Sequence, residues 1–305
     1  LLDVRDRAGR GVADAEVVVQ SPRGHAMWAR TDGAGRAWLH PDAFDPSGAA
    51  HYDVVVRKDG QQGAARLTRG QRSAVDVRLD TAAPAARARL DLVFLVDATG
   101  SMADEIDKLK TTLRTITAEV AGLPSQPDIC LALVAYRDHG DAFLLRSHDF
   151  SNDVGAFLRQ ALSPLRAAGG GDYPEAMGEA LRETVHQLSW RGDGTTRMVI
   201  LLADAPPHVG DGAPHYDEDM LAALGKGIRI FGVGASGLDP QGEFIQRQLA
   251  QYTGGRFVFL TYADAARPGS GPGRETVHDV KNYSVDTLDR LIVRLVTDEL
   301  AKGRS

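Results

Sequence analysis

Four stretches of nearly uninterrupted apolar residues constrain the fold of this chain more than any other feature of its sequence. They are Leu90–Val96, Ile129–Tyr136, Arg197–Ala203 and Ile228–Val233, and a shorter fifth stretch follows at Phe257–Leu260. Strands with so few polar positions are buried on both faces, which is typical of the parallel sheets of α/β proteins.

Segments with a helical spacing of apolar residues lie between these runs. The clearest is Met102–Val120, in which apolar side chains recur every three or four positions. Further helices are predicted at residues 154–162, 174–188, 217–224, 244–251 and 285–300. Because strands that alternate with helices form right-handed crossovers, the pattern predicts an α/β fold with a doubly wound, mostly parallel, Rossmann-like sheet.

The first 80 residues follow a different pattern, with short strands separated by turns rich in Gly and Asp. The predicted strands are Ala15–Val19, Ala37–Leu39, His51–Arg57 and Ser73–Leu79. Regular short strands with such turns favour an all-β sandwich. We therefore predict a β-sandwich domain over residues 1–80, a linker rich in small residues over 81–89, and the α/β domain over 90–305.

Composition and charge exclude several classes of protein. Hydrophobic residues make up 43% and charged residues 25% of the chain, which is typical of a globular protein. No stretch approaches the roughly 18 uncharged apolar residues of a membrane-spanning helix. Residues 1–90 hold 14 Lys and Arg against 11 Asp and Glu, and the remainder holds 21 against 30. This acidic second part argues against nucleic-acid binding.

Polar residues follow two of the buried strands at the point where each strand ends. Asp97, Thr99 and Ser101 follow the first run, and Asp204 follows the third. A flexible loop, Gly169–Asp172, lies between them and precedes a predicted helix. Ligands of such sheets bind at the carboxyl ends of the strands, so three carboxylates and two hydroxyls are expected to meet there. Hard oxygen ligands of this kind suit Mg²⁺, Mn²⁺ or Ca²⁺.

The simpler alternative is that these residues only cap the next helix. Ser and Asp favour the N-cap position. A cap would not account for Asp204, however, so a metal site explains more of the pattern.

The sequence Asp97-Ala98-Thr99-Gly100-Ser101-Met102 resembles the metal-ion-dependent adhesion site of von Willebrand factor A (VWA) domains. Three segments are similar to the branch found with alpha-kinase-like proteins and in bacteria, namely Ala135–His139, Gly169–Glu175 and Ala203–His208. The resemblance implies that Thr99 and Ser101 coordinate a metal, with Mg²⁺ expected first. It also implies that Asp97 and Asp204 bind the ion directly or hold its waters.

The chain departs from the family at the second loop, where Thr is common and Asp172 stands here. The added negative charge is expected to strengthen cation binding. It also makes the bound ion a weaker electrophile for an incoming carboxylate.

The first 80 residues resemble the carboxypeptidase-regulatory-like, immunoglobulin-like modules of bacterial proteins. Two segments carry this resemblance, Asp6–Val17 and Thr31–Ala37. Such modules usually act as spacers or adhesion elements. They favour a location outside the cytoplasm over a cytoplasmic one.

Three functions remain open from the sequence. We predict a non-enzymatic module that binds a protein partner through its metal, with an acidic side chain of the partner completing the coordination. The first alternative is a metal-assisted hydrolase with His139 or His208 as general base. The second is a scaffold whose metal is purely structural. The glycines of Gly232–Gly237 fit a turn better than a dinucleotide site, because Leu238-Asp239-Pro240 separates them from the next helix.

Overall fold

The structure is a computed structural model that describes residues 1–43, 45–81, 88–171, 173–192, 194–210, 212–235, 237–260 and 287–302. Most of the predicted linker, residues 82–87, therefore lies outside the described residues, as do residues 261–286 and 303–305 of the predicted α/β domain. No helix in the described ranges is long and apolar enough to cross a membrane.

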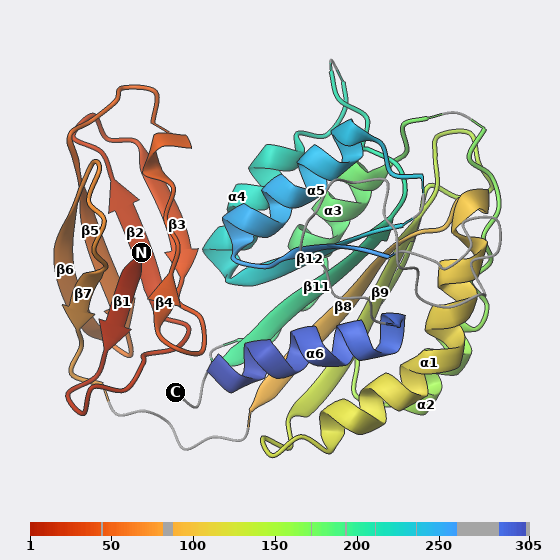
Figure 1. The fold of residues 1–305 in the computed structure, drawn as a ribbon, viewed down its shortest axis with the longest axis horizontal. Helices are drawn as coiled ribbons and strands as arrows, with labels where there is room; N and C mark the ends of the chain where they lie inside the picture. The colour runs from red at the N-terminus through yellow and green to blue at the C-terminus, as the bar shows by residue number, and fades with distance from the viewer. Residues whose placement is uncertain are drawn as a thin grey trace.

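The N-terminal part consists of two small sheets that enclose one core (Figure 1). One sheet has the order β4-β1-β7, from Arg36–Ala37, Leu2–Arg5 and Val75–Arg78. The other has the order β3-β2-β5-β6, from Ala26–Arg30, Glu16–Gln20, His51–Lys58 and Gln61–Thr68. Alternating residues of both sheets, such as Val4 and Val77 from one and Val17 and Val54 from the other, are buried between them. The predicted β-sandwich is confirmed.

The second part is a six-stranded sheet with the order β10-β9-β8-β11-β12-β13. Its strands are β8 Arg89–Asp97, β9 Asp128–Tyr136, β10 Leu145–Ser151, β11 Thr195–Ala203, β12 Ile228–Gly234 and β13 Phe257–Phe259. Only β10 is antiparallel to its neighbour. The predicted fold class, a doubly wound and mostly parallel sheet, is confirmed.

Helices cover both faces of this sheet (Figure 1). The helices α1 Ala103–Ala121 and α6 Leu288–Ala301, with the short α2 Val154–Phe157, share one core cluster with the sheet. The helices α3 Met177–His186, α4 Tyr216–Lys226 and α5 Pro240–Thr253 share another on the opposite face. The sheet is therefore buried on both sides, which explains its apolar strands.

Several boundaries differ from the sequence predictions. The helix predicted at 154–162 is an α-helical turn followed by a π-helical turn over Leu158–Leu162. The helix predicted from Pro174 begins at Met177. Strands β1, β3 and β6 were not predicted at all. In β6 no residue is buried, and its half-buried positions hold Gly63, Ala65 and Leu67, so the apolar alternation on which strand prediction depends is weak.

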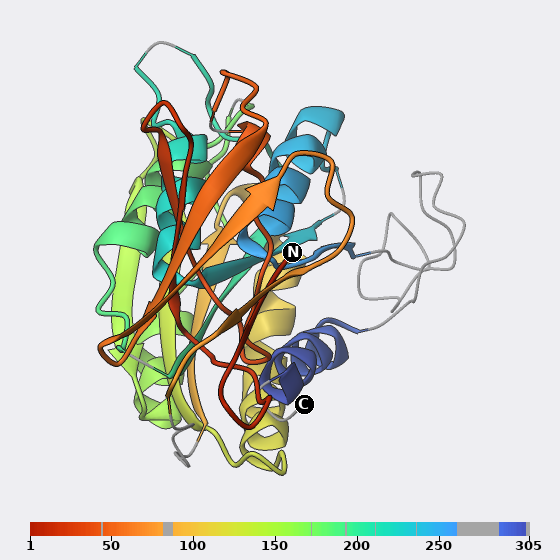
Figure 2. The same cartoon turned by 90° about the vertical axis from the view of Figure 1, so that its left-hand side faces the viewer.

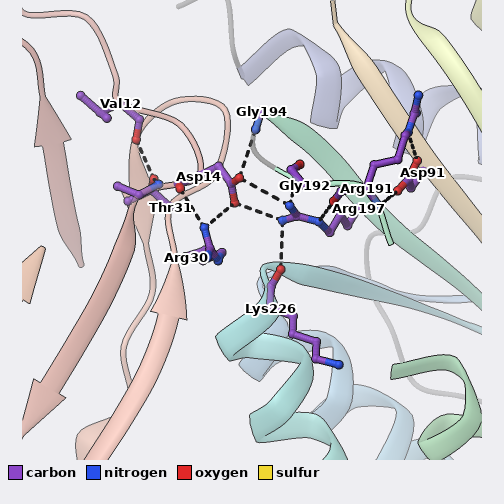
Figure 3. Close-up of polar contacts among 11 residues, drawn as sticks. Val12, Asp14, Arg30, Thr31, Asp91, Arg191, Gly192, Gly194, Arg197 and Lys226 are labelled. Carbon is purple, nitrogen blue, oxygen red and sulfur yellow. Dashed lines mark hydrogen bonds and ion pairs between the residues drawn. The ribbon is translucent and has the colours of Figure 1, made fainter. Parts of the chain in front are cut away.

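A buried ion pair joins the two parts of the molecule (Figure 3). Arg197, near the start of β11, donates from Nη1 to Asp14 Oδ1 at 3.0 Å, and both side chains are 7% exposed. The backbone N–H of Gly194 donates to Asp14 Oδ2 at 3.1 Å. Leu224 of α4 is buried in the core cluster of the sandwich. Figure 2 shows the sandwich strands lying in front of the α/β part from this side.

Candidate metal site

The loop after β8 brings three of the predicted ligands together. Asp97 is fully buried at the end of the strand, and its Oδ1 atom accepts hydrogen bonds from Thr99 N at 2.9 Å and from Thr99 Oγ1 at 2.7 Å. Thr99 Oγ1 lies 3.4 Å from Ser101 Oγ. The two hydroxyls and the carboxylate therefore form one cluster at the carboxyl end of the sheet.

The hydroxyls in this cluster do not cap a helix. Thr99 precedes a 3-10 turn over Gly100–Met102, and its side chain makes no capping hydrogen bond. Helix α1 begins after Met102, which has no side-chain cap either. The helix-cap alternative for these residues is therefore wrong.

Asp204 follows β11 on the same edge and is 7% exposed. Burial, followed by the negative charge of Asp204, raises the pKa of Asp97 to about 7. Burial also raises the pKa of Asp204. A hydrogen bond with Asp97 lowers the pKa of Asp204, so the two buried carboxyl groups are close enough to share a proton, and a bound cation in such a setting is strongly stabilising.

The glycine loop that contains Gly169 and Gly170 packs directly against the loop after β8. Gly100 N donates to Gly169 O at 3.1 Å, and Ala168 N donates to Ala98 O at 3.1 Å. Gly170 has a φ of +71°, and a Cβ atom on it would lie 2.8 Å from Thr99 Cβ. Only glycine fits such a close approach in this conformation. Asp172, the remaining predicted ligand, lies outside the described residues.

Side chains after β9 hold these loops in place. The buried guanidinium of Arg137 donates to Ala98 O at 3.1 Å and to Arg166 O at 2.7 Å. Asp141 Oδ2 accepts from Gly170 N at 3.1 Å. Arg137 therefore links the loop after β8, at Ala98, to the segment before the glycine loop, at Arg166.

Two histidines on the rim are each paired with a carboxylate. His208 Nε2 lies 2.7 Å from Asp138 Oδ1, and His139 Nε2 lies 2.9 Å from Glu179 Oε1. The two imidazole rings are 5.7 Å apart between centroids. These pairs link the segment after β9 to the segment after β11 and to α3.

The residues present fit a hard divalent cation. Asp97 Oδ2 is buried and has no hydrogen-bond partner among the described residues, so an acceptor is left for an ion or its water. No three His, Cys, Asp or Glu side chains of the described ranges form a metal-binding group. An ion here would instead be held by two carboxylates and two hydroxyls, which are oxygen donors of the kind that Mg²⁺ and Ca²⁺ prefer.

The sequence comparisons agree with this architecture. Residues 91–264, more than half of the 305 residues, match the family described as von Willebrand factor type A domain. This chain belongs to that family. Its VWA domain comprises the six-stranded sheet and most of the helices described above. Domains of the family generally act as protein-interaction modules and are often metal-dependent.

Three curated relatives are similar to parts of the chain. The alpha-protein kinase vwkA of Dictyostelium discoideum is 32% identical over 134 residues, 44% of this chain and 21% of that protein. A putative ariadne-like RING finger protein of Acanthamoeba polyphaga mimivirus is 31% identical over 40% of this chain and 12% of its own length. The human von Willebrand factor A domain-containing protein 7 is 34% identical over 38% of this chain and 12% of its own length. The chain thus spans 21% of the length of vwkA and 12% of the length of each of the other two relatives.

Sequence reasoning missed one residue at this edge. Tyr136 ends β9 beside Asp97. It gives no distinct signal, because a tyrosine that ends a buried run is equally expected in the core. Arg137 lies in the segment Ala135–His139 that the sequence singles out, but its backbone partners, Ala98 O and Arg166 O, cannot be read from the sequence.

Proposed function

We propose that this VWA domain is a non-enzymatic protein-binding module that depends on a divalent metal ion. The observation that carries the proposal is the buried pair of Asp97 and Asp204 beside the hydroxyls of Thr99 and Ser101. These four residues, with Asp172, would hold Mg²⁺, or Mn²⁺ or Ca²⁺ in its place. When bound, the ion supplies a positive charge to which an acidic side chain of a partner can bind.

The chain's own residues prepare the site for this role. Thr99 fixes one oxygen of Asp97 with two hydrogen bonds. Tyr173 stands 49% exposed at the rim, with its hydroxyl donating to Asp204 O at 3.4 Å and accepting from Asp239 N at 3.2 Å. A ring held in this way offers a rigid apolar contact to a partner, which aromatic side chains often do in protein interfaces.

Calorimetric titration of Mg²⁺, Mn²⁺ and Ca²⁺ into metal-stripped protein tests the proposal. We expect saturable binding by the wild type and none by Asp97→Ala with its fold intact by circular dichroism. Asp107→Ala, which removes a carboxylate that is 76% exposed on α1, is the matched control and should bind normally. Absence of binding by the wild type would contradict the proposal.

Two further readouts separate the alternatives. A partner whose binding survives EDTA would favour a scaffold with a structural metal. Turnover of ester or phosphoester substrates with Mn²⁺ that is lost in His139→Ala or His208→Ala would favour a hydrolase. We expect neither result.

We also propose the organisation of the whole chain. Residues 1–80 form an immunoglobulin-like module that resembles carboxypeptidase-regulatory-like modules, residues 81–89 join it to the VWA domain of 90–305, and the VWA domain belongs to the branch found with alpha-kinases and in bacteria. We propose a location outside the cytoplasm. Fractionation of the source cells checks that location, and recovery of the protein only with cytoplasmic markers would contradict it.

A further inference from the structure

One tyrosine at the metal edge has a hydroxyl group whose burial needs an explanation. The side chain of Tyr136 is fully buried, and its hydroxyl has no hydrogen-bond partner among the described residues. Among the described tyrosines, Tyr52 is the other one buried to this extent, and its hydroxyl donates to Asp42 Oδ1 at 3.2 Å. An unpaired buried hydroxyl is destabilising, so a residue that keeps one usually serves a site.

Tyr136 lies beside the central ligand of the proposed metal site. It is the register partner of Asp97 on the neighbouring parallel strand, and its carbonyl accepts from Ala98 N at 2.7 Å. Paired residues of adjacent strands project to the same face of a sheet. Asp97 Oδ2 is likewise buried, and among the described residues it receives no hydrogen bond apart from the proton that the Asp97 carboxyl can share with that of Asp204. An unused donor and an unused acceptor therefore share one edge.

The groups near the Tyr136 hydroxyl are suited to accept its hydrogen bond. The charged side chains whose field reaches it are those of Asp97, Asp204 and Glu175. All three are carboxylates, which accept hydrogen bonds.

We propose that Tyr136 is a positioning residue of the metal site, whose hydroxyl donates through one bound water to Asp97 Oδ2 and so fixes the carboxylate for the ion. The water would accept from Tyr136 and donate to Asp97, which gives both unused atoms a partner at once. Thr99 already fixes the Oδ1 atom, so each oxygen of Asp97 would be held from its own side. The inference rests on the proposed metal-dependent function.

Metal affinity of Tyr136→Phe tests the inference. Outer hydrogen-bond partners of metal ligands typically contribute ten-fold or more to affinity, so we expect Mg²⁺ and Mn²⁺ to bind about 10-fold more weakly by calorimetry. The melting temperature of the metal-free variant should change little, because phenylalanine keeps the packing and only a water-mediated hydrogen bond is lost. Tyr52→Phe is the matched control. It should lower the melting temperature and leave metal affinity unchanged.

A spectroscopic readout separates positioning from a purely structural role. In protein labelled with ¹³C at the tyrosine Cζ, the resonance missing from Tyr136→Phe belongs to Tyr136. We expect its deuterium isotope shift to show a slowly exchanging hydroxyl in the wild type, and Mg²⁺ to move this resonance but not that of Tyr52.

The outcomes distinguish the two proposals. Equal metal affinities of the wild type and Tyr136→Phe would overturn the role of Tyr136 and leave the metal site standing. A fall in the metal-free melting temperature as large as in Tyr52→Phe, without loss of affinity, would assign Tyr136 to packing alone. Absence of metal binding by the wild type would overturn both proposals.

Discussion

Asp97 connects metal binding to the pH dependence of folding. Its pKa is about 7 in the folded protein against an ordinary value of 3.8, because the side chain is buried beside Asp204. Between these two pH values the folded state binds more protons than the unfolded chain, so stability falls as the pH rises. A metal ion that neutralises the carboxylate removes this unfavourable contribution.

The metal-free protein is therefore expected to lose stability from about pH 4 to about pH 7 because of this one residue, by up to about 4 kcal/mol. Asp97→Asn has nearly the same shape and no charge, so it should lack that loss. Urea denaturation in EDTA at pH 5 and pH 8 measures the difference. The variant should gain more on the wild type at pH 8 than at pH 5, and equal differences at the two pH values would argue against the raised pKa.

The residues that form the site differ in how far the sequence reveals them. Asp97, Thr99, Ser101 and Asp204 are recognisable because each follows a buried strand, and the carboxyl ends of parallel strands meet at one edge. Tyr136 is not recognisable in this way, since a tyrosine that ends an apolar run is equally expected in the core. Its unpaired hydroxyl is visible only when the neighbours from other strands are in place.

At the scale of elements, the central strands were predictable because strands buried on both faces have nearly uninterrupted runs of apolar residues. Strand β8 has eight consecutive buried residues after Arg89. Strand β6 exposes most of one face and only partly covers the other, and β3 has just two fully buried residues. Each of these strands is the second strand of a hairpin, β3 with β2 and β6 with β5, so it is defined by this pairing more than by an apolar pattern of its own.

The glycine loop before α3 also depends on a contact between elements. Ala in the left-handed conformation costs about 1–2 kcal/mol, so Gly170→Ala and Gly140→Ala should lose similar backbone stability. Only at Gly170 would the new Cβ atom meet a ligand, because it would lie 2.8 Å from Thr99 Cβ, whereas nothing lies within 4 Å at Gly140. We therefore expect Gly170→Ala alone to weaken Mg²⁺ binding. Calorimetry on both variants checks this, and equal affinities would contradict it.

At the scale of the whole molecule, the Asp14–Arg197 pair makes the sandwich and the VWA domain depend on each other. Removing one partner leaves the other charge buried, which costs about 3–5 kcal/mol. Arg197 also donates to Lys226 O at 3.0 Å and to Gly192 O at 2.8 Å, so the network extends to α4 (Figure 3).

A double-mutant cycle measures this coupling. We expect Asp14→Ala and Arg197→Ala each to lower the free energy of unfolding by about 3 kcal/mol, and the double variant to lose less than the sum. The exposed pair of Asp53 and Arg66, with side chains 59% and 62% exposed, is the control and should couple by under about 1 kcal/mol. Additive losses at Asp14 and Arg197 would show that the two parts are held by apolar packing instead.

Strand β11 contacts the sandwich near its start, through Arg197, and is followed directly by the proposed ligand Asp204. Arg197 and Asp204 are seven residues apart along an extended chain, which places them about 23 Å from each other. The contact with the sandwich and the proposed metal edge therefore lie at opposite ends of the strand. The sandwich and the proposed metal edge are thus two separate surfaces of one molecule. A force applied to the sandwich through Arg197 would act along β11 towards Asp204.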